Sequence, residues 1–294
     1  MLSFNNGRPI AIIKGGEYNN KIVHLDVSAG DEDNSSYIEK ITYGLSQKQI
    51  DELYNAIDTN SKPKNKKLSV LFDKLLTGNS TGSNSITIES GTVEPLPNFE
   101  KPFRMYVAGP SGSGKSYFVS QILEKINKVQ PNRKIYIISD VDKDEAFDDI
   151  KNIIRLKIDE KMLFKKPIEP TVFTDGLVLF DDIDSIQNKK LSKMINILRD
   201  SILTRGRHEN ISCIVTNHLL TNYKDTRIIL NECNSFTFFP KSGASAGIKR
   251  LLEAYVGIDK ANIDAIFKLK SRAVTVYTNY PLHIIYEKGV YILS

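Results

Sequence analysis

A short glycine-rich segment constrains this chain more than any other part of its sequence. The segment consists of Gly109, Pro110, Ser111, Gly112, Ser113, Gly114, Lys115 and Ser116. It follows the apolar run Met105–Ala108 and leads into Lys115–Val129, where apolar residues recur at helical spacing. Glycine allows tight backbone curvature, so that successive N–H groups can point at a phosphate, and the N-terminus of a helix attracts anions. The sequence therefore predicts a phosphate-binding loop between a buried strand and a helix.

The spacing of this segment matches the P-loop pattern G-x4-G-K-S/T of nucleotide-binding proteins. We expect Lys115 to contact the β and γ phosphates of ATP, and the Ser116 hydroxyl to bind Mg²⁺. The alternative is a glycine-rich turn that binds no ligand. The strand before the segment and the helix after it favour a nucleotide site, with ATP and Mg²⁺ as its ligands.

Short apolar runs alternate with amphipathic stretches from Phe103 onward. The expected strands are Met105–Ala108, Ile135–Ser139, Leu177–Phe180, Ile211–Thr216 and Phe236–Phe239, and the expected second helix is Leu191–Leu203. Continuous apolar strands between amphipathic helices indicate a parallel sheet covered on both faces. The predicted fold class is an α/β P-loop NTPase, with a C-terminal β-hairpin formed by residues 274–277 and 283–286.

The chain before residue 99 has a different character. Residues 9–27 alternate apolar and polar around Gly15 and Gly16, as a β-hairpin does, and Ser46 is placed to cap a helix. Residues 77–92 are rich in Gly, Ser, Thr and Asn, which is typical of a linker. We predict an N-terminal extension of β-hairpin and helix at 1–58, a linker or mobile loop at 59–98, and the P-loop ATPase domain at 99–294.

Two adjacent carboxylates follow the apolar run Leu177–Phe180. A buried parallel strand delivers such acids to its carboxyl end, beside the phosphate-binding loop. We expect Asp181 to hold Mg²⁺, mostly through water, and Asp182 to polarise the water that attacks the γ-phosphate. Helix N-capping is the alternative role for Asp182 and for the nearby Asp184. This pair of acids predicts hydrolysis of ATP.

Polar residues at the end of the next apolar run are further candidates. Ile211–Thr216 is followed by Asn217 and His218. A side chain at this strand tip can contact both the γ-phosphate and the attacking water. We favour Asn217 for this sensor role, with His218 as the alternative, because a histidine in a loop is more often not catalytic.

Two arginines, Arg205 and Arg207, follow the helix predicted at 191–203. Guanidinium groups bind phosphate in a bidentate manner, and in ring ATPases such an arginine reaches the nucleotide of the neighbouring subunit. The alternative is a solvated helix C-terminus, where cations are favoured in any case. The sequence does not choose between the two arginines.

Composition bears on the partners and the cellular compartment of the protein. The 294 residues carry a net charge of +5, which permits contact with nucleic acid without requiring it. Cys213 and Cys233 form no CxxC pair, so we expect reduced thiols and an intracellular compartment. No apolar run approaches the roughly 18 residues of a membrane-spanning helix, and the N-terminus lacks the pattern of a signal peptide. We expect a protein that is neither secreted nor membrane-spanning.

Three stretches together resemble the poxvirus-type genome-packaging ATPases of large DNA viruses, which belong to the FtsK–HerA superfamily. They are residues 107–116, 177–182 and 205–212, and the R-H-x-N-I-S pattern in the last of them is the most discriminating. The resemblance covers residues 103–239. It implies an ASCE-type core, a homo-oligomeric ring and ATP-driven movement of double-stranded DNA into a capsid.

The same resemblance implies viral capsid proteins as partners and a location in the virion or the host-cell cytoplasm. It implies chemical roles for Lys115, Ser116, Asp181, Asp182, Asn217 and an arginine in 205–207. The superfamily often has Glu in place of Asp182 and Gln in place of Asn217, and both substitutions keep the chemical type of the side chain.

Two other functions compete with this interpretation. A P-loop kinase would need a lid and an acceptor pocket, and the sequence has no convincing arginine-rich lid segment. A nucleotide-binding viral structural protein would not need the full set of motifs. The paired acids and the polar strand tip favour hydrolysis coupled to movement.

Overall fold

The computed structural model describes most of the chain. The described residues are 1–26, 45–58, 63, 65, 68–69, 83–141, 144–161, 167–220 and 226–293. Much of the expected linker at 59–98 therefore lies outside the described residues.

A ten-stranded sheet forms the body of the molecule, in the order β4-β14-β13-β12-β11-β6-β10-β9-β7-β8. Six neighbouring strands are parallel: β6 (Arg104–Ala108), β7 (Ile135–Ser139), β8 (Ile153–Lys157), β9 (Leu177–Asp181), β10 (Ser212–Asn217) and β11 (Ser235–Phe238). Antiparallel strands extend one edge: β12 (Val274–Tyr277), β13 (His283–Tyr286), β14 (Gly289–Ile292) and β4 (Ser85–Thr87). The parallel centre and the β12–β13 hairpin confirm the fold class predicted from the sequence.

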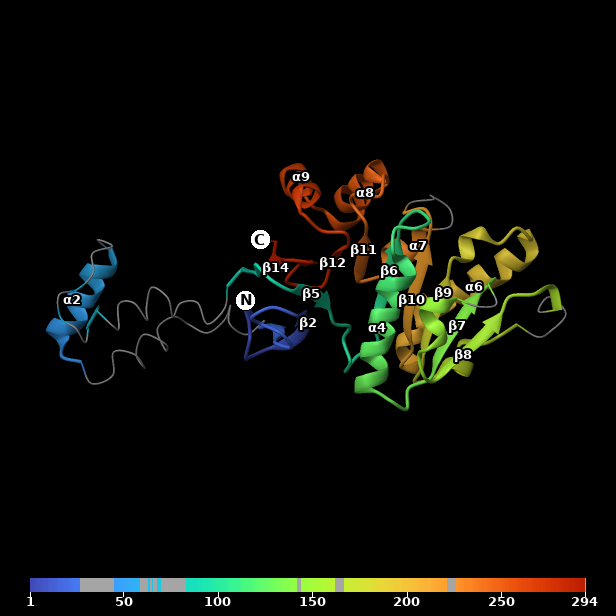
Figure 1. Cartoon of the computed structure of the whole chain (residues 1–294), viewed down its shortest axis with the longest axis horizontal. Helices are drawn as coiled ribbons and strands as arrows, with labels where there is room; N and C mark the ends of the chain where they lie inside the picture. Colours follow the sequence, from blue (N-terminus) through green and yellow to red (C-terminus); the bar gives the residue numbers. More distant parts are fainter. Residues whose placement is uncertain are drawn as a thin grey trace.

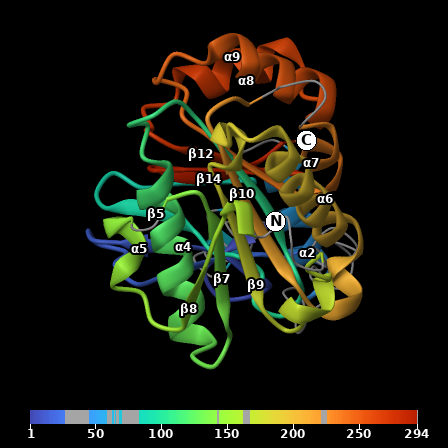
Figure 2. The same cartoon turned by 90° about the vertical axis from the view of Figure 1, so that its right-hand side faces the viewer.

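Helices cover both faces of this sheet because successive strand residues point to opposite sides. Met105 and Val107 of β6 pack into one apolar core with the helix α4 (Lys115–Val129) and the short α5 (Glu145–Asp148). Tyr106 and Ala108 pack into a second core on the other face (Figures 1 and 2). The helices there are α6 (Lys189–Arg205), α7 (Arg227–Glu232), α8 (Ser245–Leu251) and α9 (Lys260–Lys268).

A second, four-stranded sheet lies beside the antiparallel edge of the first. Its strand order is β1-β3-β2-β5, formed by β1 (Leu2–Ser3), β2 (Arg8–Lys14), β3 (Ile22–Leu25) and β5 (Thr92–Pro95). Gly15 and Gly16 have φ of 74° and 69° in the β2–β3 turn, a conformation that glycine adopts at little cost. Ile285 and Val290 of the large sheet share the core of the small one, so the two sheets pack together.

Part of the range 59–98, expected to be a linker or mobile loop, contributes strands to the two sheets. Two segments in this range are strands: β4 completes the edge of the large sheet and β5 completes the small one. The backbone N–H of Val93 donates to the carbonyl of Glu287 at 2.9 Å and so joins β5 to the end of β13. The helix α2 (Gln47–Asp58) follows Ser46, as expected.

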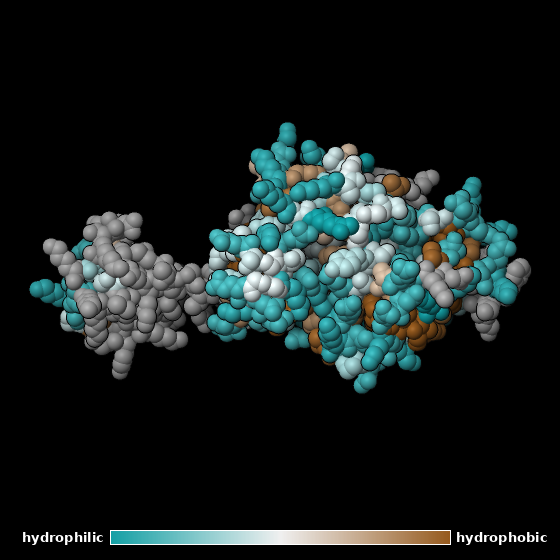
Figure 3. Space-filling view, viewed as in Figure 1, coloured by the Kyte–Doolittle hydropathy of each residue, from teal (hydrophilic) through white to brown (hydrophobic). Residues whose placement is uncertain are grey.

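Polar and charged side chains cover most of the face shown in Figure 3, with smaller apolar areas between them. Within the described part of the chain, no helix has both the length and the apolar character that crossing a membrane requires.

Candidate active site

The loop at residues 109–115 begins where β6 ends and is fixed by its neighbours. The N–H of Gly109 donates to the carbonyl of Asn217, at the end of β10, at 3.1 Å. A side chain at Gly109 would approach Phe239 to 2.7 Å, and Gly112 and Gly114 have φ of 74° and 106°. Glycine is therefore needed at these three positions, for space at the first and for backbone conformation at the other two.

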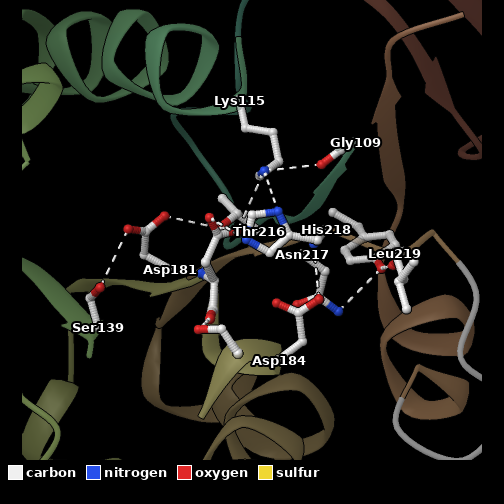
Figure 4. A network of polar contacts seen from close by, with 12 residues as sticks. Gly109, Lys115, Ser139, Asp181, Asp184, Thr216, Asn217, His218 and Leu219 are labelled. Carbon is white, nitrogen blue, oxygen red and sulfur yellow. Dashed lines mark hydrogen bonds and ion pairs between the residues drawn. The ribbon is translucent and has the colours of Figure 1, made fainter. Parts of the chain in front are cut away.

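Lys115 is the first residue of α4, and its side chain is buried. Its Nζ donates to the carbonyl of Gly109 at 3.0 Å, and it lies 3.2 Å from His218 Nδ1 and 3.7 Å from Asp182 Oδ1 (Figure 4). The cation thus lies between the phosphate-binding loop and the ends of β9 and β10. The parallel strands bring these segments together because their carboxyl ends meet at one edge of the sheet.

Asp181 ends β9 and is buried on the α4 side of the sheet. The Thr216 hydroxyl lies 2.9 Å from its Oδ1, and the Ser139 hydroxyl makes a long contact of 3.5 Å with Oδ2. Burial, and then the charge of Asp182, raise the pKa of the Asp181 carboxyl to about 6. A bound cation would favour the charged form, so this position fits a Mg²⁺ ligand.

Asp182 has a left-handed backbone, with φ of 46°, which Asp tolerates better than most residues. Its N–H donates to the Thr216 hydroxyl at 2.8 Å, and its Oδ2 lies 3.2 Å from His218 Nε2. Its side chain makes no cap hydrogen bond to the 3-10 helix Ile183–Ser185. Asp184 accepts from the backbone N–H of His218 at 2.9 Å. Both acids therefore contact the β10 tip, and these contacts are distinct from the helix capping considered above.

His218 is the residue at the β10 tip that joins the cation to the acid. Its Nδ1 faces the Lys115 ammonium, which can only donate, so Nδ1 accepts and Nε2–H donates to Asp182. From the sequence, Asn217 was favoured as the sensor and His218 was the alternative. The distinction depends on which face of β10 each side chain occupies.

The Asn217 side chain lies on the other face, in the core beneath Tyr106. Its Nδ2 donates to the Tyr106 hydroxyl at 3.2 Å, and Asn217 is only 3% exposed. Its Oδ1 is buried without a hydrogen-bond partner among the described residues. The sensor role of Asn217 stays a prediction, and the structure places His218, rather than the Asn217 amide, against Lys115 and Asp182.

Two serines belong to the loop region, Ser113 within the loop and Ser116 just after Lys115. Ser113 Oγ is buried and has no hydrogen-bond partner in the described part of the chain. Ser116 follows Lys115 in the first turn of α4 and is half-buried. A polar atom left unpaired beside a glycine loop fits an anionic ligand, and Ser116 with Asp181 could hold its Mg²⁺.

The two candidate arginines lie near the amino-terminal ends of the parallel strands, whereas the phosphate-binding loop lies at their carboxyl ends. Arg205 ends α6, donates to Ser201 Oγ at 2.5 Å and lines a cavity of about 610 Å³ between α6 and β8. Arg207 lines a different cavity with Lys101 and Phe103, just before β6. Strands rise about 3.3 Å per residue, so the length of β6 separates both arginines from the phosphate-binding loop of their own chain.

Sequence reasoning missed Arg272, which lies against the phosphate-binding loop. Its Nε donates to the carbonyl of Ser113 at 3.1 Å, across 159 residues of sequence. Only the antiparallel pairing of β12 with β11 brings Arg272 to this edge, and no local pattern in the sequence indicates that pairing.

Comparison with known proteins decides the family. The chain is 39% identical over 210 residues to an uncharacterized protein, V3, of Sputnik virophage, and the match covers 71% of this chain and 84% of V3. The family model described as Poxvirus A32 protein matches residues 97–240. This chain belongs to the poxvirus A32 protein family. The resemblance to poxvirus-type packaging ATPases is thereby confirmed, and with its P-loop and paired acids the chain is an ATPase of this type.

Solved structures of similar fold include the packaging ATPase B204 of Sulfolobus turreted icosahedral virus. It is 14% identical, with 66% of this chain and 98% of B204 covered and a TM-score of 0.46. The type VII secretion ATPase EccC of Thermomonospora curvata is 12% identical, with 69% of this chain and 28% of EccC covered and a TM-score of 0.49. Both TM-scores are below 0.5, so the family assignment rests on sequence.

Proposed function

We propose that this chain hydrolyses ATP to move double-stranded DNA into a viral capsid, working as a homo-oligomeric ring. The observation that carries the proposal is the meeting of Lys115, Asp181 and Asp182 at one edge of the sheet in a member of the poxvirus A32 family. The net charge of +5 suits a polyanionic partner. Viral capsid proteins are the further partners, and the virion or the host-cell cytoplasm is the proposed location.

The chemistry follows from the positions of the side chains. Lys115 neutralises charge on the β and γ phosphates, and the backbone N–H groups of the loop bind their oxygens. Asp182 orients the attacking water and accepts its proton, while His218 Nε2–H fixes the orientation of the Asp182 carboxylate. Thr216 carries a single hydroxyl proton, so it donates to Asp181 or to Asp182 while it accepts from the Asp182 N–H.

Mg²⁺ would be held by Ser116 and Asp181 and would neutralise phosphate charge. The raised pKa of Asp181 supports this position, because an uncompensated carboxylate is costly there and a divalent cation removes the cost.

A DNA-stimulated ATPase assay tests the proposal against its two rivals. We expect ATP turnover to rise when duplex DNA is added, and the stimulation to fall with increasing salt, because phosphate contacts release counterions. Heparin serves as a polyanion control, and phosphate release without transfer to an acceptor separates hydrolysis from a kinase reaction.

Three outcomes would contradict the proposal. Turnover that requires a small-molecule acceptor would indicate a kinase. Binding of ATP without turnover, with or without duplex DNA, would indicate a nucleotide-binding structural protein. Stimulation by heparin to the same extent as by duplex DNA would remove DNA as the specific partner.

A further inference from the structure

The order of the strands sets the direction in which a bound nucleotide must lie. The phosphate-binding loop follows β6, whose neighbours are β10 on one side and β11 on the other. Asp181 and Asp182 end β9, on the β10 side. The terminal phosphate must face these acids, so the sugar and base of the same nucleotide extend in the opposite direction, over β11 and β12.

A cavity of about 390 Å³ lies in that direction, next to the loop. Gly114 and Tyr117 line it from α4, and Phe239 lines it from the end of β11. The register Phe238↔Val274↔Tyr286 brings Arg272 and Tyr286 to the same edge of the sheet, and they line its far side. Ligand sites commonly occupy roughly 300–1,000 Å³, so the space suits a nucleoside.

Tyr117 offers an exposed aromatic ring two residues after Lys115. The residue is 64% exposed, although it belongs to a helix whose other face packs on the core. Gln121 Nε2 donates to the Tyr117 hydroxyl at 3.2 Å and to Glu94 Oε1 at 3.3 Å, so Gln121 ties the ring to β5. Tyr117 also lines the cavity, and an aromatic ring in such a position can stack against a base.

Arg272 supplies a cation between this cavity and the phosphate-binding loop. Its guanidinium lies 3.0–3.1 Å from the position that a Cβ atom at Gly114 would occupy, so Arg272 packs directly on the loop. In the described part of the chain, no carboxylate forms an ion pair with it, and only its Nε is used, toward Ser113. Its Nη groups remain free for a phosphate.

We infer that this cavity holds the nucleoside half of ATP, with the base against Tyr117 and Arg272 at the phosphate nearest the sugar. The inference rests on the proposed ATP site and adds a role for the N-terminal sheet, because residues 92–95 of β5 form one wall. Nucleotide binding would then span the P-loop core, the C-terminal hairpin and the N-terminal sheet.

Steady-state kinetics with two ligands tests the inference. KM for ATP is measured, together with the inhibition constant of tripolyphosphate, which has the phosphate chain and no nucleoside. For Tyr117→Ala we expect KM to rise about tenfold, the size of one lost base–aromatic contact, with kcat and tripolyphosphate inhibition unchanged. Tyr117→Phe keeps the ring and should behave as wild type, and Tyr280→Ala, at a residue 87% exposed and outside the cavity lining, is the matched control.

Arg272→Gln should raise KM for ATP and weaken tripolyphosphate together, because it removes a phosphate contact. An unchanged KM in Tyr117→Ala, or an equal rise in Tyr117→Phe, would overturn the stacking site. Unchanged KM for ATP and unchanged tripolyphosphate inhibition in Arg272→Gln would show that Arg272 does not contact the nucleotide. Either result can occur while wild-type protein still hydrolyses ATP, so it would contradict this inference alone. Absence of ATP turnover by wild-type protein would contradict the proposed function, and with it this inference.

Discussion

Asp182 is the residue proposed to act as the base in ATP hydrolysis. Its carboxylate faces both Lys115 and His218, while the neighbouring Asp181 is more deeply buried and contacts neither of them; the Thr216 hydroxyl lies near both carboxylates. The two acids therefore differ in surroundings, and we assign them different roles: Asp182 to the water and Asp181 to Mg²⁺.

Asp182→Asn should keep Mg-ATP binding and lower kcat by about 10²–10⁴-fold, because the amide fits the site but cannot accept a proton. The measurement is ATP affinity together with single-turnover hydrolysis. Asp181→Asn is the matched variant and should weaken Mg²⁺-dependent binding. If Asp181→Asn binds normally without hydrolysing and Asp182→Asn is active, the two roles are reversed.

His218 should matter for the rate, although the sequence favoured Asn217 as the sensor. His218→Ala removes the contact that orients Asp182, and a misplaced base costs up to about 100-fold in kcat. His208→Ala, at an exposed residue beyond the far edge of the sheet, is the control and should be unchanged. Equal rates for the two variants would exclude a role for His218. Asn217→Ala should chiefly lower stability, through loss of the bond to Tyr106.

At the scale of elements, the sequence predicts best where the pattern is local. Lys115–Val129 and Ile135–Ser139 have the predicted boundaries, because buried apolar runs and a helix-opening loop are visible over a few residues. The strands β4 and β5 lie in a segment whose composition favours a linker, and they form only because distant strands offer them partners. For the same reason the position of the glycine-rich loop between β6 and α4 was predictable, whereas the approach of Arg272 to that loop and the placement of His218 rather than Asn217 beside Lys115 were not.

The ion pair between Glu94 of β5 and Lys125 of α4 should hold the N-terminal sheet on the core. The pair is 2.8 Å long, the two side chains are 16% and 13% exposed, and burial lowers the pKa of Lys125. Glu94→Ala leaves the ammonium buried without its partner, so the free energy of unfolding should fall by about 3 kcal/mol in urea denaturation. Glu124→Ala, exposed on the same helix, is the control. Equal stability of the two variants would show that this pair does not hold the sheet.

At the scale of the whole molecule, Arg205 and Arg207 both lie far from the phosphate-binding loop of their own chain, so the proposed arginine contact with a nucleotide requires a second subunit. In a ring, we expect either Arg205→Ala or Arg207→Ala to lower kcat. The loss should be about 10³–10⁵-fold if the replaced arginine acts as the trans arginines of GTPases do. Mixing that variant with Lys115→Ala should restore part of the activity, because some interfaces then combine an intact loop with an intact arginine. A strictly monomeric protein with ATP and DNA, or no recovery in any mixture, would remove the ring mechanism.

ATP turnover by wild type and Lys115→Ala tests the central claim most directly. Lys115 contacts the loop, His218 and Asp182 and should leave the fold intact when it is replaced, which the melting temperature checks. We predict that Lys115→Ala loses at least about 100-fold in kcat, as expected when a donor to transition-state charge is removed. Lys128→Ala, exposed in the last turn of the same helix, should keep wild-type turnover. Turnover near wild type in a folded Lys115→Ala variant would contradict the assignment of this site as an ATPase centre.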